Sequence, residues 1–236
     1  MRTYRTSTGP LTERPFYTDI EIENICTDEL HALSMFPSVP SPIRIDRFIE
    51  KRFKVTPEYR DLGDDVLGIT QFGPRGVQAV IVARSLDEEG TKTAERRIRT
   101  TLAHEAGHGL LHAHLFVPDL NERPLFGDYS DPKAPMILCR DIPDGRKGHL
   151  PGYKGQWWEY QANLAIGGFL LPRLLMGMAL DHVLETGGSF GTKVLAATRR
   201  EQAARILADT FEVNPVVARI RLQQVYPAAD EGQFQL

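Results

Sequence analysis

Two histidines four residues apart, with a glutamate directly after the first, constrain this 236-residue chain more than any other feature: His104, Glu105 and His108. Residues i and i+4 of an α-helix lie one above the other on the same face. Two neutral imidazoles at that spacing can hold one divalent cation, and zinc is the usual ion. Glu105 would then lie close enough to take a proton from a bound water. The stretch therefore predicts a metal-binding helix.

The surrounding residues predict this helix independently of the motif. Thr91 or Thr93 can cap its start, and Glu95 falls in the first turn, where the helix dipole favours negative charge. An apolar stripe at helical spacing comprises Ile98, Leu102, Ala106, Leu110 and Ala113. The two histidines are expected on a different face. Gly107 and Gly109 beside them need a reason, such as close approach of another backbone or a substrate.

A catalytic zinc site needs a third protein ligand and an open fourth position for water. The best candidate is Glu159, near the start of a second predicted apolar helix that runs to Leu171. Asn163 lies one turn further on the same face, and we expect it to accept a hydrogen bond from the far N–H of a ligating imidazole. The alternative is that Glu159 only complements the helix dipole. The histidine motif favours the ligand role.

At these residues the chain resembles the ImmA/IrrE metallopeptidases, a gluzincin-like family of zinc proteins. The resemblance covers residues 39–225 and lies in Thr101–His112, in Glu159–Asn163 leading to Leu170–Pro172, in Val66–Thr70 and in a helix near the C-terminus. Because two separate motifs and their flanking residues agree, the resemblance is specific. The connection between the two motifs is longer than in many zincins, and residues 1–38 have no counterpart in the family.

The resemblance implies an α+β, zincin-like fold, in which a small, mostly antiparallel sheet packs on the active-site helix and the C-terminal part is helical. It implies that His104, His108 and Glu159 bind Zn²⁺ and that Glu105 is the general base. Family members studied as peptidases cut protein substrates, notably repressors that control mobile elements or stress genes. The expected partner is therefore a protein substrate, such as a repressor or an antitoxin-like regulator.

The domain organisation follows from composition and periodicity. Residues 1–38 are predicted to form an N-terminal arm or extension with little periodicity, ending in a proline-rich linker. Residues 39–225 are predicted to form the metallopeptidase domain, with a long insert or lid at 115–156 and C-terminal helices at 192–225. Residues 226–236 are predicted to be a tail.

Within this domain, Ser41 can cap a helix with Pro42 at its first position. The apolar face of that helix would comprise Ile45, Phe48, Ile49 and Phe53. Strands are predicted over 66–72 and 77–83, around a hairpin turn at 73–76. We expect an extended peptide to pair with an edge strand of this sheet, because main-chain hydrogen bonds suit many sequences.

The segment 115–156 is rich in proline, glycine and aspartate, and long connections of this kind are usually functional or disordered. Tyr153 or His149 within it could hydrogen-bond the oxyanion formed at an attacked carbonyl. Cys139 could occupy the open metal position, although a structural role is favoured. His112 is expected to be too far along the helix to share the ion, so a surface or packing role is favoured.

From Thr192 onward, apolar spacing predicts a long helix to Phe211, and Asn214 with Pro215 starts another. The pair resembles a helix-turn-helix in outline, with five arginines available for phosphate: Arg199, Arg200, Arg205, Arg219 and Arg221. We favour a packing role for these helices. The net charge of −3 provides no overall basic field, so nucleic-acid binding is disfavoured.

Composition also agrees with a soluble cytoplasmic enzyme. Cys26 and Cys139 form no disulfide framework, and the polar N-terminus lacks the apolar core of a signal peptide. The stretch nearest to a membrane span is 162–180, which polar residues and a proline interrupt. Two buried helices are therefore expected there, and no membrane association.

These features predict a zinc-dependent endopeptidase in which Glu105 takes a proton from a metal-bound water that attacks a peptide carbonyl. The alternative is a zinc-stabilised regulator that binds DNA or a protein without proteolysis. A structural zinc site is normally closed by four protein ligands and has no use for Glu105, which argues against that alternative. A third possibility is a peptidase-derived scaffold that is active only with a partner.

Overall fold

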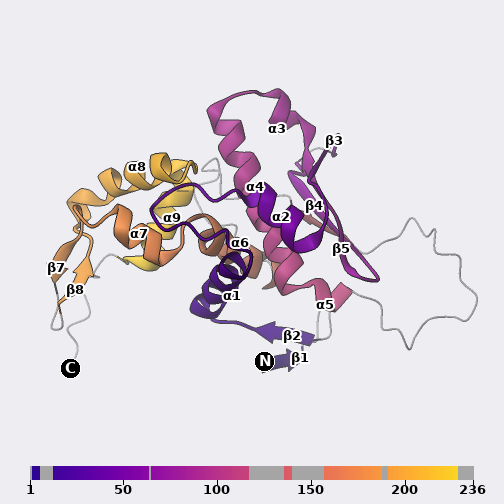
Figure 1. Cartoon of the computed structure of the whole chain (residues 1–236), viewed down its shortest axis with the longest axis horizontal. Helices are drawn as coiled ribbons and strands as arrows, with labels where there is room; N and C mark the ends of the chain where they lie inside the picture. Colours follow the sequence, from indigo (N-terminus) through magenta and orange to yellow (C-terminus); the bar gives the residue numbers. More distant parts are fainter. Residues whose placement is uncertain are drawn as a thin grey trace, which may run out of the picture.

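The computed structural model describes residues 2–5, 13–63, 65–116, 136–139, 157–187 and 191–227. The chain is an α+β protein with a small mixed sheet at one side, against which α4 packs, while most other helices lie beyond α4 (Figure 1). The helices are α1 (Asp19–Ala32), α2 (Ile45–Phe53), α3 (Arg84–Glu88), α4 (Lys92–Leu111), α5 (Ala113–Phe116), α6 (Trp157–Leu170), α7 (Arg173–Ala179), α8 (Arg200–Thr210) and α9 (Pro215–Val225). The strands are β1 (Arg2–Arg5), β2 (Glu13–Phe16), β3 (Glu58–Arg60), β4 (Gly68–Gly73), β5 (Gly76–Ala83), β6 (Met136–Cys139), β7 (Glu185–Gly187) and β8 (Thr192–Val194).

The central sheet has the strand order β3-β5-β4-β6. β4 pairs antiparallel with β5 and with β6, whereas β3 runs parallel to β5, so the expectation of a mostly antiparallel sheet is confirmed. The predicted hairpin is also confirmed, and Gly76 turns it with a φ of 102°, a value that glycine adopts without strain. β6 comes from the segment predicted as an insert and adds an outer strand beside β4.

Helix α4 lies between this sheet and helix α6 (Figure 1). The hydroxyl of Thr91 caps the start of α4 by accepting a hydrogen bond from the backbone N–H of Ala94. Of the two predicted caps, Thr91 is therefore the one that the structure shows. From Thr100 to Gly109 every residue is buried, not only the predicted apolar stripe. Covering on both sides therefore places the histidine motif inside the protein.

The two glycines of α4 allow close packing of other parts of the chain. A Cβ at Gly107 would lie 2.8 Å from the Cβ of Ala165 and 3.2 Å from the Cα of Ala162, both on α6. A Cβ at Gly109 would lie 2.6 Å from the ring of Phe53. Of the two reasons anticipated from the sequence, the structure shows close approach by the protein itself.

Residues 1–38, predicted to be an arm with little periodicity, contain a helix that this weak periodicity did not reveal. α1 begins with a capping box, in which Thr18 and Glu21 each accept a hydrogen bond from the other's backbone N–H. Its buried side chains include Ile22, Cys26 and Leu30, and α1 packs against α6. The apolar face is hard to recognise in the sequence because the charged residue Glu23 lies within it.

Glu23 is buried because it meets two arginines from distant helices. Its carboxylate accepts hydrogen bonds from the backbone N–H and the Nε of Arg173, at 2.7 and 2.6 Å. The second arginine is Arg221 of α9, whose Nη2 lies 2.8 Å from the same carboxylate and whose Nε donates to the carbonyl of Leu171. One buried negative charge thus joins α1, α7 and α9.

Two predicted helix starts are wrong. α2 begins at Ile45 with Arg44 as its N-cap, and Ser41 instead donates its hydroxyl to the carbonyl of Val39. The hydroxyl of Ser41 is thus bonded back to the preceding chain and caps no helix, and the first buried apolar residue of the helix is Ile45. The predicted helix from Thr192 begins only at Arg200, since 192–194 form strand β8, which pairs with β7. The predicted start of α9 at Asn214 and Pro215 is confirmed.

Among the described residues, no single helix is long and apolar enough to cross a membrane. α6 and α7 reach that length only together, and they are bent by 47° at the break between them. Their buried apolar side chains include Phe169, Leu170, Leu175 and Met176. The prediction of two helices in this stretch is confirmed, but only α6 is largely buried, because α7 exposes Leu174 and Met178.

We expect Glu23→Gln to lower the free energy of unfolding by about 3–5 kcal/mol, because Arg221 would remain buried without an opposite charge. The matched control is Glu201→Gln, which removes an exposed ion pair with Arg219. That variant should lose much less stability, because exposed pairs are screened by water. Chemical denaturation measures both values, and equal losses would contradict the assignment of Glu23 to the core.

Candidate metal centre

Three ligand groups converge where α4 crosses α6. His104 and His108 lie on successive turns of α4, and Glu159 lies in the first turn of α6. Their nearest ligand atoms all lie within 4.8 Å of one another, and this group could hold a metal ion. The first helix supplies two ligands through its own periodicity, while the third requires the packing of α6 on α4.

The separations between these atoms suit a tetrahedral ion. The Nε2 atoms of His104 and His108 are 2.9 Å apart, and Glu159 Oε2 lies 3.1 Å from His104 Nε2. Glu159 Oε1 lies 3.5 Å from His108 Nε2. Ligands at zinc-like bond lengths on a tetrahedron are about 3.3 Å apart. The chain therefore presents three donor atoms at the corners that one small cation requires.

The carboxylate of this group is strongly stabilised in its charged form. Burial alone would raise the pKa of Glu159, but its contacts with the rings of His104 and His108 outweigh burial and hold this pKa below its usual range. Both imidazoles are fully buried, whereas the Glu159 side chain is 23% exposed. Solvent and a substrate would therefore reach the centre from the Glu159 side.

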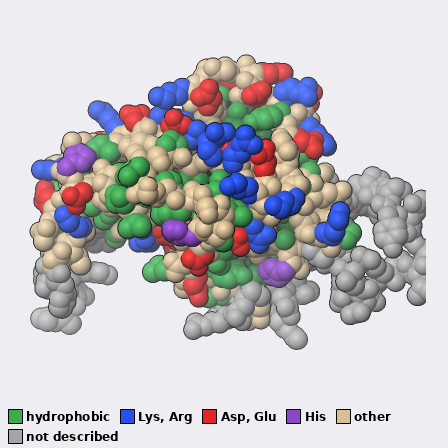
Figure 2. Space-filling view, in the orientation of Figure 1, with side chains coloured by type: hydrophobic (Ala, Val, Ile, Leu, Met, Phe, Trp, Pro, Cys, Tyr) green, Lys and Arg blue, Asp and Glu red, His purple; other side chains and the backbone are tan. Residues whose placement is uncertain are grey.

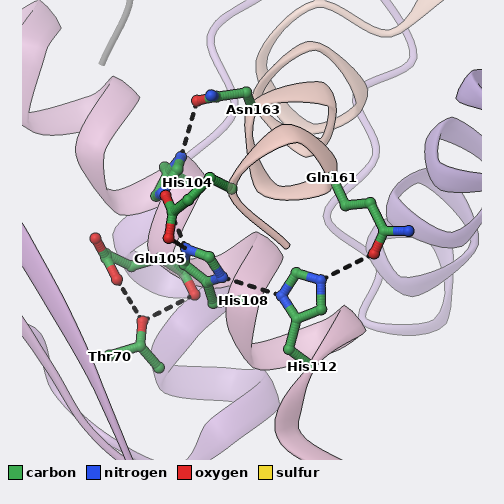
Figure 3. A network of polar contacts seen from close by, with 8 residues as sticks. Thr70, His104, Glu105, His108, His112, Gln161 and Asn163 are labelled. Atoms are coloured by element: carbon green, nitrogen blue, oxygen red, sulfur yellow. Dashed lines mark hydrogen bonds and ion pairs between the residues drawn. The ribbon is translucent and has the colours of Figure 1, made fainter. Parts of the chain in front are cut away.

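Asn163 lies where the sequence predicts it. Its Oδ1 is 3.0 Å from Nδ1 of His104, one turn along α6 from Glu159 (Figure 3). An amide oxygen can only accept, so the Nδ1 of His104 carries the proton. The opposite nitrogen, Nε2, is then left with its lone pair directed at the shared centre.

Glu105 lies beside the centre and is fully buried between α4 and β4. Its Oε2 accepts a hydrogen bond from the hydroxyl of Thr70 on β4 (Figure 3). Its Oε1 has no hydrogen-bond partner in the part of the chain that the structure describes. Gly68 makes room for this carboxylate, since a Cβ there would lie 2.5 Å from Oε1. Thr70 thus holds one oxygen of this buried acid, while the other packs against Gly68 without a hydrogen-bond partner among the described residues.

The pKa of Glu105 suits proton transfer near neutrality. Burial raises it to about 7, and the neighbouring Glu159 adds to this, while His104 and Thr70 lower it. A cation at the centre would lower it further, because a nearby positive charge favours the carboxylate. A general base works best when its pKa lies near the working pH.

The sequence did not identify three polar residues around the centre: Thr70, His112 and Gln161. His112 is fully buried, not at the surface, and its Nδ1 lies 3.0 Å from Nδ1 of His108 (Figure 3). Its Nε2 lies 3.0 Å from Oε1 of Gln161. Of the surface and packing roles expected for His112, burial excludes the surface role, and the hydrogen bonds to His108 and Gln161 were not predicted.

For three further predicted residues the structure describes either the backbone alone or nothing. Tyr153 and His149, the candidates for oxyanion stabilisation, lie outside the described residues. Cys139 is the last residue of β6, where its backbone pairs with Gly68 of β4. The backbone position of Cys139 next to β4 is compatible with either of the roles considered for it.

Comparison with models of known protein families and with curated proteins finds no match for this chain. Membership of the ImmA/IrrE metallopeptidases therefore stays a prediction from the residues of the two motifs. The convergence of His104, His108 and Glu159 is compatible with a metal site.

We expect the purified protein to contain about one zinc ion per chain and His104→Ala to lose most of it, because two protein ligands rarely retain the ion. The control is His182→Ala, which removes an exposed histidine far along the chain from both motifs. Inductively coupled plasma mass spectrometry measures the metal content. Equal zinc in His104→Ala and wild type would contradict the ligand assignment.

Proposed function

We propose that the protein is a zinc-dependent endopeptidase of the ImmA/IrrE type, which hydrolyses a peptide bond of a protein substrate. The observation that carries this proposal is the pairing of three converging ligand groups with a buried acid. Among the described residues, His104, His108 and Glu159 supply three ligand atoms, and Glu105 lies nearby with Oε1 unpaired. Three protein ligands and an open position are typical of catalytic zinc sites.

The chain's own residues divide the work of hydrolysis. A zinc ion bound here would lower the pKa of a water molecule from about 15.7 towards about 7 and polarise the substrate carbonyl. Glu105 takes a proton at Oε1, the oxygen without a partner, and returns it to the leaving amine. Thr70 holds Oε2, so that the carboxylate stays oriented while it gains and loses the proton.

The sheet next to the centre supports an extended peptide as the substrate form. β4 contacts α4, and Thr70 of β4 pairs in register with Ile137 of β6. The outer edge of β4 therefore accepts an antiparallel strand over four residues, directly beside Glu105. Among the described residues β6 is the outer strand on this side of the sheet, and a substrate strand would add beside it through main-chain hydrogen bonds. A repressor or an antitoxin-like regulator with an exposed extended segment is the substrate we propose.

The contacts of the C-terminal arginines favour proteolysis over DNA binding. Arg221 is buried, and Arg219 pairs with Glu201 on the neighbouring helix. Arg200 donates to the carbonyl of Tyr226. Figure 2 shows one face of the protein, on which acidic side chains lie among the basic ones, including beside the group of basic side chains near its centre. These three arginines of α8 and α9 therefore already contact groups of the protein itself, which leaves few of the five arginines to bind phosphate.

We expect Glu105→Gln to retain zinc and to lose proteolysis by several orders of magnitude, because an amide cannot accept the proton. The matched control is Glu95→Gln, which changes an exposed glutamate on the same helix and should cleave as wild type does. Co-expression with repressors encoded near this gene, followed by mass spectrometry of fragments, identifies the substrate and measures cleavage. Cleavage by zinc-loaded Glu105→Gln at the wild-type rate would refute the assigned base.

Thr70→Val should shift the acid limb of the kcat/KM–pH profile to higher pH. The hydroxyl of Thr70 lowers the pKa of Glu105, so its loss raises that pKa further. Glu105 must be ionised to act as a base. When its pKa is higher, a higher pH is needed to reach the same activity. The control is Thr100→Val, in which the lost hydroxyl bonds the helix backbone at Arg96. A shift to lower pH, or none, in Thr70→Val would contradict this role.

A further inference from the structure

We propose that His112 and Gln161 are positioning residues for the metal centre. Together they form a hydrogen-bonded chain from the backbone of Pro15 to His108, which fixes the ring of His108 with its Nε2 unprotonated and facing the ion. The inference rests on the proposed function only in assuming that the three converging ligands hold a cation. It assigns a specific task to a histidine and a glutamine that neither bind the ion nor touch the substrate.

The direction of every proton in the chain follows from its far end. The carbonyl of Pro15 can only accept, and it lies 2.9 Å from Nε2 of Gln161, which therefore donates to it. The amide oxygen of Gln161 must then face the other way, where it lies 3.0 Å from Nε2 of His112. Because this oxygen can only accept, the Nε2 of His112 carries a proton.

Burial completes the argument at the two rings. His112 and His108 are fully enclosed, where a charged imidazolium would be costly. A neutral ring has a single N–H, so the Nδ1 of His112 is bare and accepts from the Nδ1 of His108, 3.0 Å away. The Nδ1 of His108 thus holds that ring's proton. Its Nε2 is left with a lone pair.

This arrangement excludes a competing state of His108. In the other neutral form, the Nε2 of His108 would carry the proton and donate it to Glu159, whose Oε1 is 3.5 Å away. That contact would occupy two of the three ligands and exclude the ion. Asn163 excludes the same state for His104. With both rings fixed, three acceptor atoms converge without a proton between them, and a cation is the partner that stabilises them.

The chain also connects the N-terminal segment to the centre. Pro15 belongs to β2, Gln161 to α6, and the histidines to α4 and its C-cap. Gln161 lies between Glu159 and Asn163, so α6 contributes a ligand and a support for each histidine within five residues. The N-terminal segment thereby participates in the centre through one backbone carbonyl.

The test measures zinc affinity by competition with a chromophoric chelator, without any substrate. We expect His112→Phe and Gln161→Met each to weaken zinc binding by about 10–100-fold, the usual cost of losing a support of a ligand. His112→Gln should recover part of this loss, because its amide oxygen can accept from the Nδ1 of His108. The control is His114→Phe, an exposed histidine two residues away, which should bind zinc as wild type does.

A double-mutant cycle separates the proposed chain from simple packing. If the two residues act as one chain, the combined variant should lose little more affinity than either single variant. Changes of less than about twofold in both single variants, with only the unfolding temperature of the metal-free protein lowered, would overturn the proposal. If His112→Phe fails to fold, Gln161→Met and His112→Gln still decide it.

The outcome is distinguishable from that of the proposed function. Zinc affinity that depends on His112 and Gln161, in a protein that cleaves nothing, would support the positioning role and refute the peptidase. Proteolysis that depends on Glu105, with zinc affinity unaffected by substitution of His112 or Gln161, would support the peptidase and refute the positioning role. Wild-type protein that binds no zinc would overturn both.

Discussion

The close crossing of α4 and α6 at Gly107 is the constraint on which the candidate metal centre depends. Gly107 lies between the two histidines of α4, and it brings this helix against Ala162, which lies between Gln161 and Asn163. Only at this short separation can one turn and a half of α6 reach His104, His108 and His112 together. Any side chain at Gly107 would push the helices apart and separate the ligands from their supports. The glycine costs helix propensity, and the geometry of the centre explains why it is present.

Burial gives the two carboxylates at the centre opposite properties. Both lie in surroundings that disfavour charge, yet Glu159 faces two imidazoles and ionises readily, whereas Glu105 faces a threonine hydroxyl and has a pKa near 7. The lowered pKa of Glu159 favours its charged form, which suits it to hold a cation, whereas Glu105 can exchange a proton. The difference comes from partners on different elements, since α6 supplies Glu159 and β4 supplies Thr70. Such divergence between neighbouring acids is typical of sites that perform acid–base chemistry.

The N-terminal segment supports this centre from two places. Through Glu23 it neutralises Arg173 and Arg221, and so joins the ends of α7 and α9 to α1. Through Pro15 it supplies the acceptor at which the hydrogen-bonded chain to His108 begins. Residues that looked like an extension in the sequence thus contact both the core and the polar surroundings of the candidate ligands.

The sequence by itself determined what depends on nearest neighbours along a helix. The four-residue step places His104 above His108 and Glu159 above Asn163, and the hairpin at Gly76 follows from local turn chemistry. Only the tertiary structure decided which distant groups meet these residues: Thr70, Gln161 and Pro15 reach their partners across 35, 49 and 146 positions. Periodicity fixes the face on which a side chain lies, but not the element packed against that face. For the same reason the burial of Glu23 could not be predicted from the sequence. Its partner arginines become neighbours only when α1, α7 and α9 pack together.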